Sequence, residues 1–149
     1  MRAVVQRVKK AFVSVHDNII GQIEKGLVVF LGVADGDTMD DVNYMAEKIV
    51  GLRVFEDEEG KINKSLQDVG GALLVISQFT LLGDVRKGRR PSFIQAANPD
   101  EAKKLYEALI EVCKNKVKKV EKGQFQADML VNVLNDGPVT ILLDSKKQF

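Results

Sequence analysis

The sequence predicts an α/β fold in which sheets are covered on one side by two main helices. Two patterns support this prediction: many short runs of β-branched and apolar residues, and two segments with apolar residues at helical spacing. A chain of 149 residues with 45% apolar side chains is the size of one domain with a substantial core. No internal repeat, low-complexity segment or change in composition divides it, so we expect a single domain over residues 1–149.

Strand patterns dominate the first third of the chain. Residues 3–8 and 11–15 are rich in β-branched side chains and are separated by Lys9-Lys10, which indicates two strands. The segment His16-Asp17-Asn18 suggests a turn into a further strand at 19–23. Residues 26–33 are almost wholly apolar, as is typical of a strand covered on both faces.

Both predicted helices have recognisable beginnings. The first covers about residues 38–52, after a turn at Asp35–Thr38 that offers capping side chains. The second begins with Asn98 as N-cap, Pro99 in the first turn and Glu101 three residues after the cap. The apolar stripe of the second helix faces a core and consists of Ala102, Leu105, Leu109, Cys113 and Val117.

The remaining elements are strands and one long loop. Residues 72–76 form a buried strand that leads directly into Ser77, and residues 127–134 and 139–143 close the chain as strands. A loop of about fifteen residues lies between the strand at 72–76 and the second helix. Loops of this length in a compact domain are usually functional or mobile.

Composition excludes several classes of protein. The 22 basic and 21 acidic side chains nearly cancel, so net charge gives no argument for nucleic-acid binding. The single cysteine, Cys113, rules out an internal disulfide and a multi-cysteine metal site. No stretch approaches the roughly 20 apolar residues of a membrane span, and the first residues lack the apolar run of a signal peptide. We therefore expect a soluble cytoplasmic protein without a membrane partner.

The segment Ser77-Gln78-Phe79-Thr80-Leu81 is the strongest candidate site. Polar groups at the carboxyl end of a buried strand often line a pocket. A strand that gives way to a loop also leaves backbone N–H groups free to form an oxyanion hole. On the residues alone, an equally good reading is that Ser77 and Thr80 only satisfy neighbouring backbone groups.

The step Gly137-Pro138 is the second unusual feature. Proline cannot donate to a sheet ladder, so it belongs at sheet edges, strand starts or bulges. The glycine before it removes steric limits and makes a cis bond possible, although only about 5–6% of X–Pro bonds in folded proteins are cis. Physical reasoning alone favours an ordinary turn between two strands.

Other side-chain clusters are less specific. The only histidine, His16, lies beside Asp17 in a predicted turn, so a Ser–His triad with Ser77 or Thr80 is not supported by spacing. The loop residues Arg86, Lys87, Arg89 and Arg90 are basic, and Gly88 among them permits close backbone approach, which favours contact with phosphates.

The two segments 77–81 and 135–140 together resemble the signature segments of the D-aminoacyl-tRNA deacylases of bacterial and eukaryotic type. The resemblance extends in order through residues 1–8, 26–32, 52–81, 88–93 and 123–143, which is essentially the whole chain. It implies a three-layer β/β/α fold with mixed sheets that form a barrel-like core. It also implies a homodimer that hydrolyses the ester of D-aminoacyl-tRNA and of mischarged glycyl-tRNA, without a cofactor or a metal.

The resemblance implies a role for each matched residue. Ser77, Gln78, Phe79 and Thr80 would form the floor and oxyanion region of the pocket, with Leu81 beside them. Gly137-Pro138 would be joined by a cis bond and would enter the partner subunit's pocket, where it would exclude L side chains by steric clash. Phe125 and Met129 would line the adenosine site, and Arg7 would brace the Gly-Pro segment.

The resemblance also implies an unusual mechanism, in which the terminal ribose 2′-hydroxyl of the tRNA activates water while the protein positions and polarises the ester. Thr80 as a covalent nucleophile is the competing mechanism. Two other functions stay open: a non-catalytic tRNA-binding homodimer of the same fold, and a small-ester hydrolase that uses Thr80 or Ser77. DNA is not implied as a partner.

Gln126 departs from the resemblance, because a small residue, commonly glycine, is expected between Phe125 and Ala127. Pointing inward it would narrow the adenosine pocket, and pointing outward it would change little.

Overall fold

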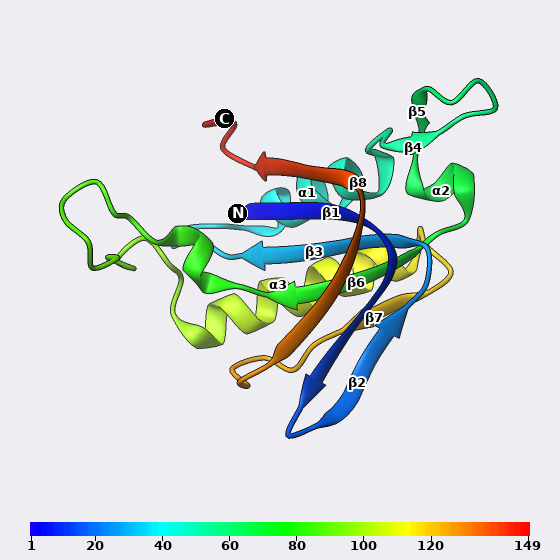
Figure 1. Ribbon diagram of the computed structural model, residues 1–149. Coiled ribbons are helices and arrows are strands. Elements are labelled where there is room, and N and C mark those ends of the chain that lie inside the picture. The colour runs from blue at the N-terminus through cyan, green and yellow to red at the C-terminus, as the bar shows by residue number, and fades with distance from the viewer.

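The computed structural model describes all of residues 1–149 and shows a strongly curved mixed sheet with two long helices on one of its faces (Figure 1). The predicted α/β class is therefore confirmed. The helices are α1 (Met39–Gly51), α2 (Leu66–Val69), the 3₁₀ helix η1 (Phe79–Leu82) and α3 (Pro99–Lys114). The strands are β1 (Arg2–Val15), β2 (Asn18–Ile23), β3 (Gly26–Gly32), β4 (Phe55–Glu56), β5 (Ile62–Lys64), β6 (Ala72–Ser77), β7 (Val120–Lys122) and β8 (Leu130–Asp144).

The main sheet is organised around β1. Its strands follow the order β2-β1-β3-β6-β7, with β8 also paired to β1, while β4 and β5 form a separate two-stranded sheet. The amino-terminal half of β1 pairs with β3 and its carboxyl-terminal half pairs with β2, both antiparallel. Strand β6 runs parallel to both β3 and β7. Parallel neighbours bring the carboxyl ends of β3 and β6 to the same edge of the sheet, where the candidate segment at Ser77 begins.

Two predicted strand breaks are wrong. Residues 3–8 and 11–15 belong to the single strand β1, and Lys9 and Lys10 lie exposed within it. The pairing with β8 shifts register between Val8 and Lys10, so a bulge accommodates the two lysines without ending the strand. The predicted strands 127–134 and 139–143 are likewise one strand, β8, which begins only at Leu130 and runs through the Gly-Pro step. Strands β5 and β7, the short helix α2 and the 3₁₀ helix η1 were not predicted.

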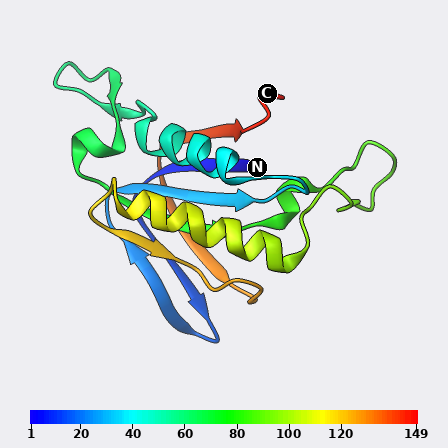
Figure 2. The same ribbon diagram turned by 180° about the vertical axis from the view of Figure 1, so that it is seen from behind.

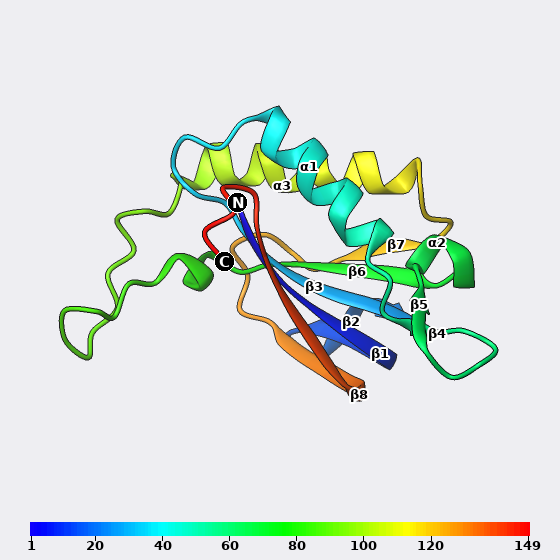
Figure 3. The same cartoon turned by 90° about the horizontal axis from the view of Figure 1, so that it is seen from above.

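The structure confirms both predicted long helices and their N-caps. Thr38 caps α1 through a capping box with Asp41, and Asn98 caps α3 by accepting from the Glu101 N–H at 3.1 Å. Pro99 occupies the first turn of α3, as predicted. From behind and from above, α1 and α3 lie side by side across one face of the sheet (Figures 2 and 3).

The core has two parts, one on each face of the sheet. The larger cluster packs the sheet against α1 and α3 and includes Met45, Ile49, Leu105 and Leu109. The smaller cluster lies on the other face, inside the curl, around Leu74. These two apolar layers explain why β3 and β6 are apolar on both faces, and they give the predicted β/β/α arrangement with a barrel-like core.

A close approach between strands produces the curl. A Cβ at Gly21 in β2 would lie 2.8 Å from the carbonyl oxygen of Lys122 in β7, so only glycine lets these two strands come together. None of the helices is long and apolar enough to cross a membrane.

Candidate functional site

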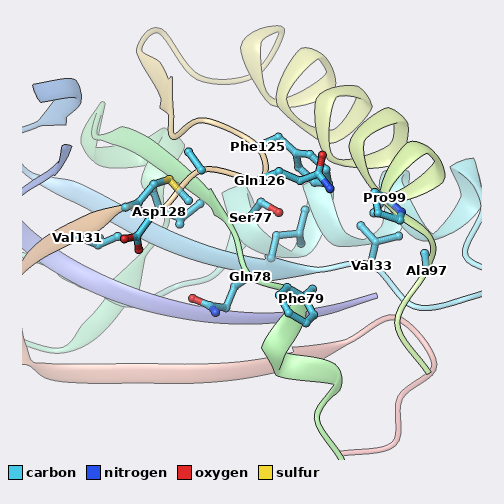
Figure 4. Close-up of a pocket in the computed structure, with 15 residues that line it drawn as sticks. Val33, Ser77, Gln78, Phe79, Ala97, Pro99, Phe125, Gln126, Asp128 and Val131 are labelled. Atoms are coloured by element: carbon cyan, nitrogen blue, oxygen red, sulfur yellow. The ribbon is translucent and has the colours of Figure 1, made fainter. Parts of the chain in front are cut away.

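A cavity of about 640 Å³ lies at the carboxyl end of β6 (Figure 4). This volume falls in the range of about 300–1,000 Å³ that small-molecule sites occupy. Ten of its fifteen lining residues are hydrophobic. The lining comes from the ends of β3 and β6, the start of η1, the start of α3, the segment between β7 and β8, and the start of β8: Leu31, Val33, Ile76, Ser77, Gln78, Phe79, Ala97, Pro99, Ala102, Phe125, Gln126, Ala127, Asp128, Met129 and Val131.

The floor of the cavity forms where β6 changes into η1. The Gln78 N–H donates to the Leu31 carbonyl at 2.8 Å, and the chain then turns into the 3₁₀ helix. Gln78 is the N-cap residue, but its side chain caps no backbone group of η1 and instead donates to the hydroxyl oxygen of Thr80. The opening N–H groups of a helix have no partner within it, and here they belong to Phe79 and Thr80.

Packing against β3 fixes the position of η1. A Cβ at Gly32 would lie 2.6 Å from Leu82 Cδ2 and 2.9 Å from the Gln78 carbonyl oxygen. Glycine at this position therefore lets η1 rest directly on the end of β3. The floor is a rigid backbone feature, which suits polarisation of a substrate carbonyl better than mobile side chains would.

Phe79 forms one rim of the cavity. Its side chain is 55% exposed, and its ring meets Phe93 edge to face with centroids 5.0 Å apart. Phe93 belongs to the long loop between η1 and α3, so this aromatic pair ties the loop to the cavity rim.

The opposite wall rests on a buried tyrosine. Tyr106 in α3 donates its hydroxyl to the Val75 carbonyl at 2.8 Å, and its ring lies 5.9 Å from that of Phe125. Burial raises the pKa of Tyr106, so this hydroxyl stays protonated and keeps donating. Below the wall, a Cβ at Gly123 would lie 2.6 Å from Met129 Sδ, so Met129 packs against bare backbone. Tyr106 and Gly123 were not predicted as part of the site.

Gly137 and Pro138 lie in a bulge of β8 and are exposed. Their peptide bond is cis. Gln6 pairs with Thr140 and Val8 with Asn135, so the four residues 136–139 bulge opposite Arg7 alone. A bulge on a strand with one free edge is a place where proline costs no ladder hydrogen bond.

Arg7 holds this bulge from inside the protein. Its side chain is buried and donates to the carbonyl oxygens of Asp136 at 3.0 Å and Val54 at 2.6 Å. Gly137 has φ of 133°, and a Cβ there would lie 2.8 Å from Val139 Cγ2 and 3.1 Å from Arg7 Nη2. Both the backbone conformation and the space therefore require glycine.

The basic loop lies beyond η1. A bridge between Asp84 and Ser92 closes its base, and Arg86 pairs with Asp84 at 2.7 Å. Hydrogen bonds from Arg86 hold the pKa of Asp84 below its usual range. Lys87, Arg89 and Arg90 are exposed and take part in no salt bridge, which leaves three cationic groups available.

The structure brings only part of the predicted set together. Ser77, Gln78, Phe79, Phe125 and Met129 line one cavity. The other predicted residues lie outside its lining: Arg7, Thr80, Leu81, Arg86, Lys87, Arg89, Arg90, Gly137 and Pro138.

No nucleophile–histidine pair forms at the cavity. His16 lies exposed in the β1–β2 turn with φ of 48° and does not line the cavity. Cys113 is buried on α3, and burial raises the pKa of its thiol to about 11, which keeps it protonated and unreactive.

Several lining residues escaped sequence reasoning. Val33, Ala97, Pro99 and Ala102 line the cavity because the end of β3 meets the start of α3. The Ala97 N–H donates to the Val33 carbonyl at 3.0 Å. The two residues are 64 positions apart, so no local sequence pattern predicts this contact. Asp128 was assigned to a strand and lies instead in the segment that borders the cavity.

The fold and site together define a small α/β protein with a barrel-like sheet and a cavity whose floor is a strand-to-3₁₀ junction. The family model described as D-Tyr-tRNA(Tyr) deacylase matches residues 4–144. The chain belongs to this family.

Sequence relatives agree with the family model over the full length. Proteins named D-aminoacyl-tRNA deacylase from Clostridium novyi (strain NT), Clostridium tetani (strain Massachusetts / E88) and Thermosipho africanus (strain TCF52B) are 58%, 61% and 59% identical to this chain. Each alignment covers 149 residues, 100% of both proteins.

Two solved structures share the fold. One, titled c-Myc DNA Unwinding Element Binding Protein, superposes with a TM-score of 0.92 at 41% identity, covering 97% of this chain and 98% of its own. The other is described as a probable eukaryotic D-amino acid tRNA deacylase, with a TM-score of 0.81 at 18% identity, covering 95% of this chain and 97% of its own. At that identity the second match speaks for the fold alone.

Proposed function

We propose that this protein hydrolyses the ester bond of D-aminoacyl-tRNA, and of mischarged glycyl-tRNA, to release free tRNA and the amino acid. The observation that carries the proposal is the cavity floored by Ser77, Gln78 and Phe79 in a chain of the deacylase family. The relatives that match over their whole length are named for this activity. We infer that residues 1–149 act as one deacylase domain in the cytoplasm.

The proposed chemistry depends on position and polarisation. The backbone N–H groups of Phe79 and Thr80 would donate to the ester carbonyl oxygen as negative charge develops on it. Gln78 would lie beside them, and Leu81 would support the turn. An aminoacyl ester is already activated, so an oriented water and a stabilised oxyanion supply much of the catalysis.

We infer that the tRNA itself supplies the base. The terminal ribose 2′-hydroxyl would activate the attacking water, since the cavity lining contains no histidine, lysine or cysteine and its single carboxylate, Asp128, is exposed. The proposed reaction uses no cofactor and no metal. Thr80 is the competing nucleophile, but it lies outside the lining and its hydroxyl accepts from the Gln78 amide.

Chirality would be set by a second copy of the chain. Gly137 and Pro138 are exposed and do not line the cavity of their own chain, which fits entry into the cavity of a homodimer partner. Exposed Leu130, Leu134 and Leu142 on the same strand offer apolar surface for such a contact. The carbonyl groups of a rigid Gly-Pro step could hold the substrate amine and leave no room for an L side chain, whereas glycine has none to exclude.

The remaining predicted residues would bind the rest of the tRNA end. Phe125 and Met129 would hold the terminal adenosine by stacking and apolar contact. Lys87, Arg89 and Arg90, with Arg86, would contact backbone phosphates outside the cavity.

The first experiment is hydrolysis of matched D-tyrosyl-tRNA and L-tyrosyl-tRNA by the purified protein. We expect fast loss of the D ester with the L ester intact. Loss of both esters would contradict the Gly-Pro argument and indicate an unselective esterase. Binding of tRNA with loss of neither ester would replace the proposal with a non-catalytic tRNA-binding homodimer.

The solved relative with a DNA-binding title calls for one control. Duplex DNA should not compete with the tRNA substrate, because the proposed site takes an unpaired 3′ end. Inhibition by duplex DNA at concentrations similar to those of tRNA would count against tRNA as the preferred partner.

A further inference from the structure

Gln126 is the residue of the cavity whose conformation and position are hardest to explain by packing alone. It lies in the segment between β7 and β8, where the Ala127 N–H donates to the Gln124 carbonyl at 3.3 Å. This bond closes a four-residue turn with Phe125 and Gln126 at its centre. Gln126 has φ of 60° at the third position of the turn.

Turns with a positive φ at the third position favour glycine or asparagine, because a Cβ crowds the backbone there. Glutamine in this conformation is uncommon, and residues held in such conformations concentrate at functional sites. The left-handed conformation has a second consequence here, since it directs the side chain of Gln126 to the cavity that it lines (Figure 4).

The amide of Gln126 is available to a ligand. The side chain is exposed and makes no hydrogen bond to another protein group. Figure 4 shows it beside Phe125, on the wall opposite Gln78 and Phe79, with Asp128 farther along the same segment. The lining is mostly apolar, so this amide is one of only four polar side chains there that could hydrogen-bond to a ligand, with Ser77, Gln78 and Asp128.

The geometry points to Gln126 as a reader of the terminal adenine, a role that rests on the proposed function. The primary amide offers one acceptor and two donors. Adenine presents its 6-amino group as a donor next to a ring nitrogen as an acceptor, and a glutamine amide can bond to both at once. Phe125, fixed by Tyr106, supplies the flat surface against which the base lies.

This arrangement divides the binding of the base between two neighbouring residues. Phe125 contributes stacking, which tolerates any base, and Gln126 contributes the hydrogen bonds that distinguish adenine. The departure from a small residue at position 126 therefore adds selectivity for the nucleoside rather than only narrowing the cavity.

The test compares D-tyrosyl-tRNA ending in adenosine with the same tRNA ending in purine riboside, which lacks the 6-amino group. The variants are Gln126→Met, which keeps length and apolar contact but removes the amide, and the control Gln124→Ala, in the same turn but outside the cavity. For the wild-type protein we expect purine riboside to raise KM about 10-fold with little change in kcat.

Gln126→Met should raise KM for the adenosine substrate about 10-fold, and purine riboside should then add no further loss. Gln124→Ala should behave as the wild type does. The role of the amide would be overturned if Gln126→Met still discriminated between the adenosine and purine riboside substrates, or if its KM equalled that of the wild type. Only a steric role for Gln126 would then remain.

A binding measurement separates this inference from the proposed activity. An uncharged RNA minihelix ending in CCA, and its purine riboside counterpart, can be titrated calorimetrically without any ester. Suppose that no ester is cleaved, but the minihelices still bind with a preference for adenine that Gln126→Met abolishes. The proposed hydrolysis would then be wrong, and recognition of adenine by Gln126 would still be supported. Equal binding of both minihelices by the wild type would overturn the reader even if D esters are cleaved.

Discussion

The two unusual segments of this chain differ in what their own chain does with them. The junction at Ser77–Phe79 forms the floor of a cavity, surrounded by β3, α3 and the β7–β8 segment. The step Gly137-Pro138 is as firmly held, by Arg7 from below, but it is exposed and borders no cavity of its chain. In the homodimer proposed above, this segment would act on the cavity of a second copy.

The comparison also separates two kinds of chemistry. The cavity floor offers hydrogen-bond donors, which are the first N–H groups of η1. In the Gly-Pro step proline has no N–H, so the groups that follow the glycine N–H are two carbonyl acceptors. Donors suit a developing oxyanion, and acceptors suit a substrate ammonium group. In the proposed dimer one chain would polarise the ester, and the other would exclude amino acids of the L configuration.

The largest effect should come from the substrate. A D-tyrosyl-tRNA whose terminal adenosine lacks the 2′-hydroxyl, with the amino acid on the 3′-oxygen, should lose about 10²- to 10⁴-fold in kcat, the usual contribution of a positioned acid–base group. Single-turnover hydrolysis with saturating protein measures this loss apart from binding. Equal turnover of the deoxy substrate would mean that the cavity itself activates water.

A second test attacks the rigidity of the Gly-Pro step. Gly137→Ala should reduce the free energy of unfolding by about 1–3 kcal/mol for the strained backbone at a φ of 133°, and by about 1–3 kcal/mol more for the contacts with Val139 and Arg7. Urea unfolding measures the sum of the two losses.

Gly36→Ala is the matched control. Gly36 also has a positive φ, 82°, but a Cβ there would meet nothing within 4 Å. Only the backbone part of the loss should appear, about 1–2 kcal/mol. Equal destabilisation by the two substitutions would show that the crowding around Gly137 has no energetic weight.

A third test concerns selectivity without a change of fold. Pro138→Ala removes an exposed ring, so we expect the ratio of D to L hydrolysis to fall about 10-fold, or the dimer to weaken, corresponding to about 1.4 kcal/mol. Pro91→Ala, in the exposed basic loop, should change neither. Hydrolysis of both esters and sedimentation of the variants measure the two quantities, and wild-type values for both in Pro138→Ala would contradict the proposed role of the step.

The two segments also differ in how far sequence could predict them. The end of β6 was predictable because a buried apolar run gives way to polar residues, which is a local signal, and the caps at Thr38 and Asn98 are local in the same way. The continuity of β8 through Gly137-Pro138 was not predictable. It depends on β1 continuing its pairing on both sides of the bulge, and pairing partners distant in sequence leave no local trace.

The same limit applies to the cavity. Its floor was identified, but its walls at Val33, Ala97 and Pro99 arise from packing between β3 and α3. The role of Arg7 could be expected only from the resemblance, since a lone arginine in a strand usually faces solvent. Its hydrogen bonds to Asp136 and Val54 supply the physical reason.

The smallest effect should come from removing the side chain of Thr80, the competing nucleophile. Thr80 lies in the floor segment but outside the cavity lining, and its hydroxyl accepts a hydrogen bond from Gln78. If only its backbone N–H matters, Thr80→Ala should keep kcat within about 3-fold of the wild type, because a substitution by alanine leaves that N–H in place. Steady-state hydrolysis of D-tyrosyl-tRNA measures the rate, and circular dichroism checks the fold. A loss of about 10³-fold or more in a folded variant would instead assign the reaction to a covalent threonine intermediate, and the floor would then act by its side chains rather than by its backbone.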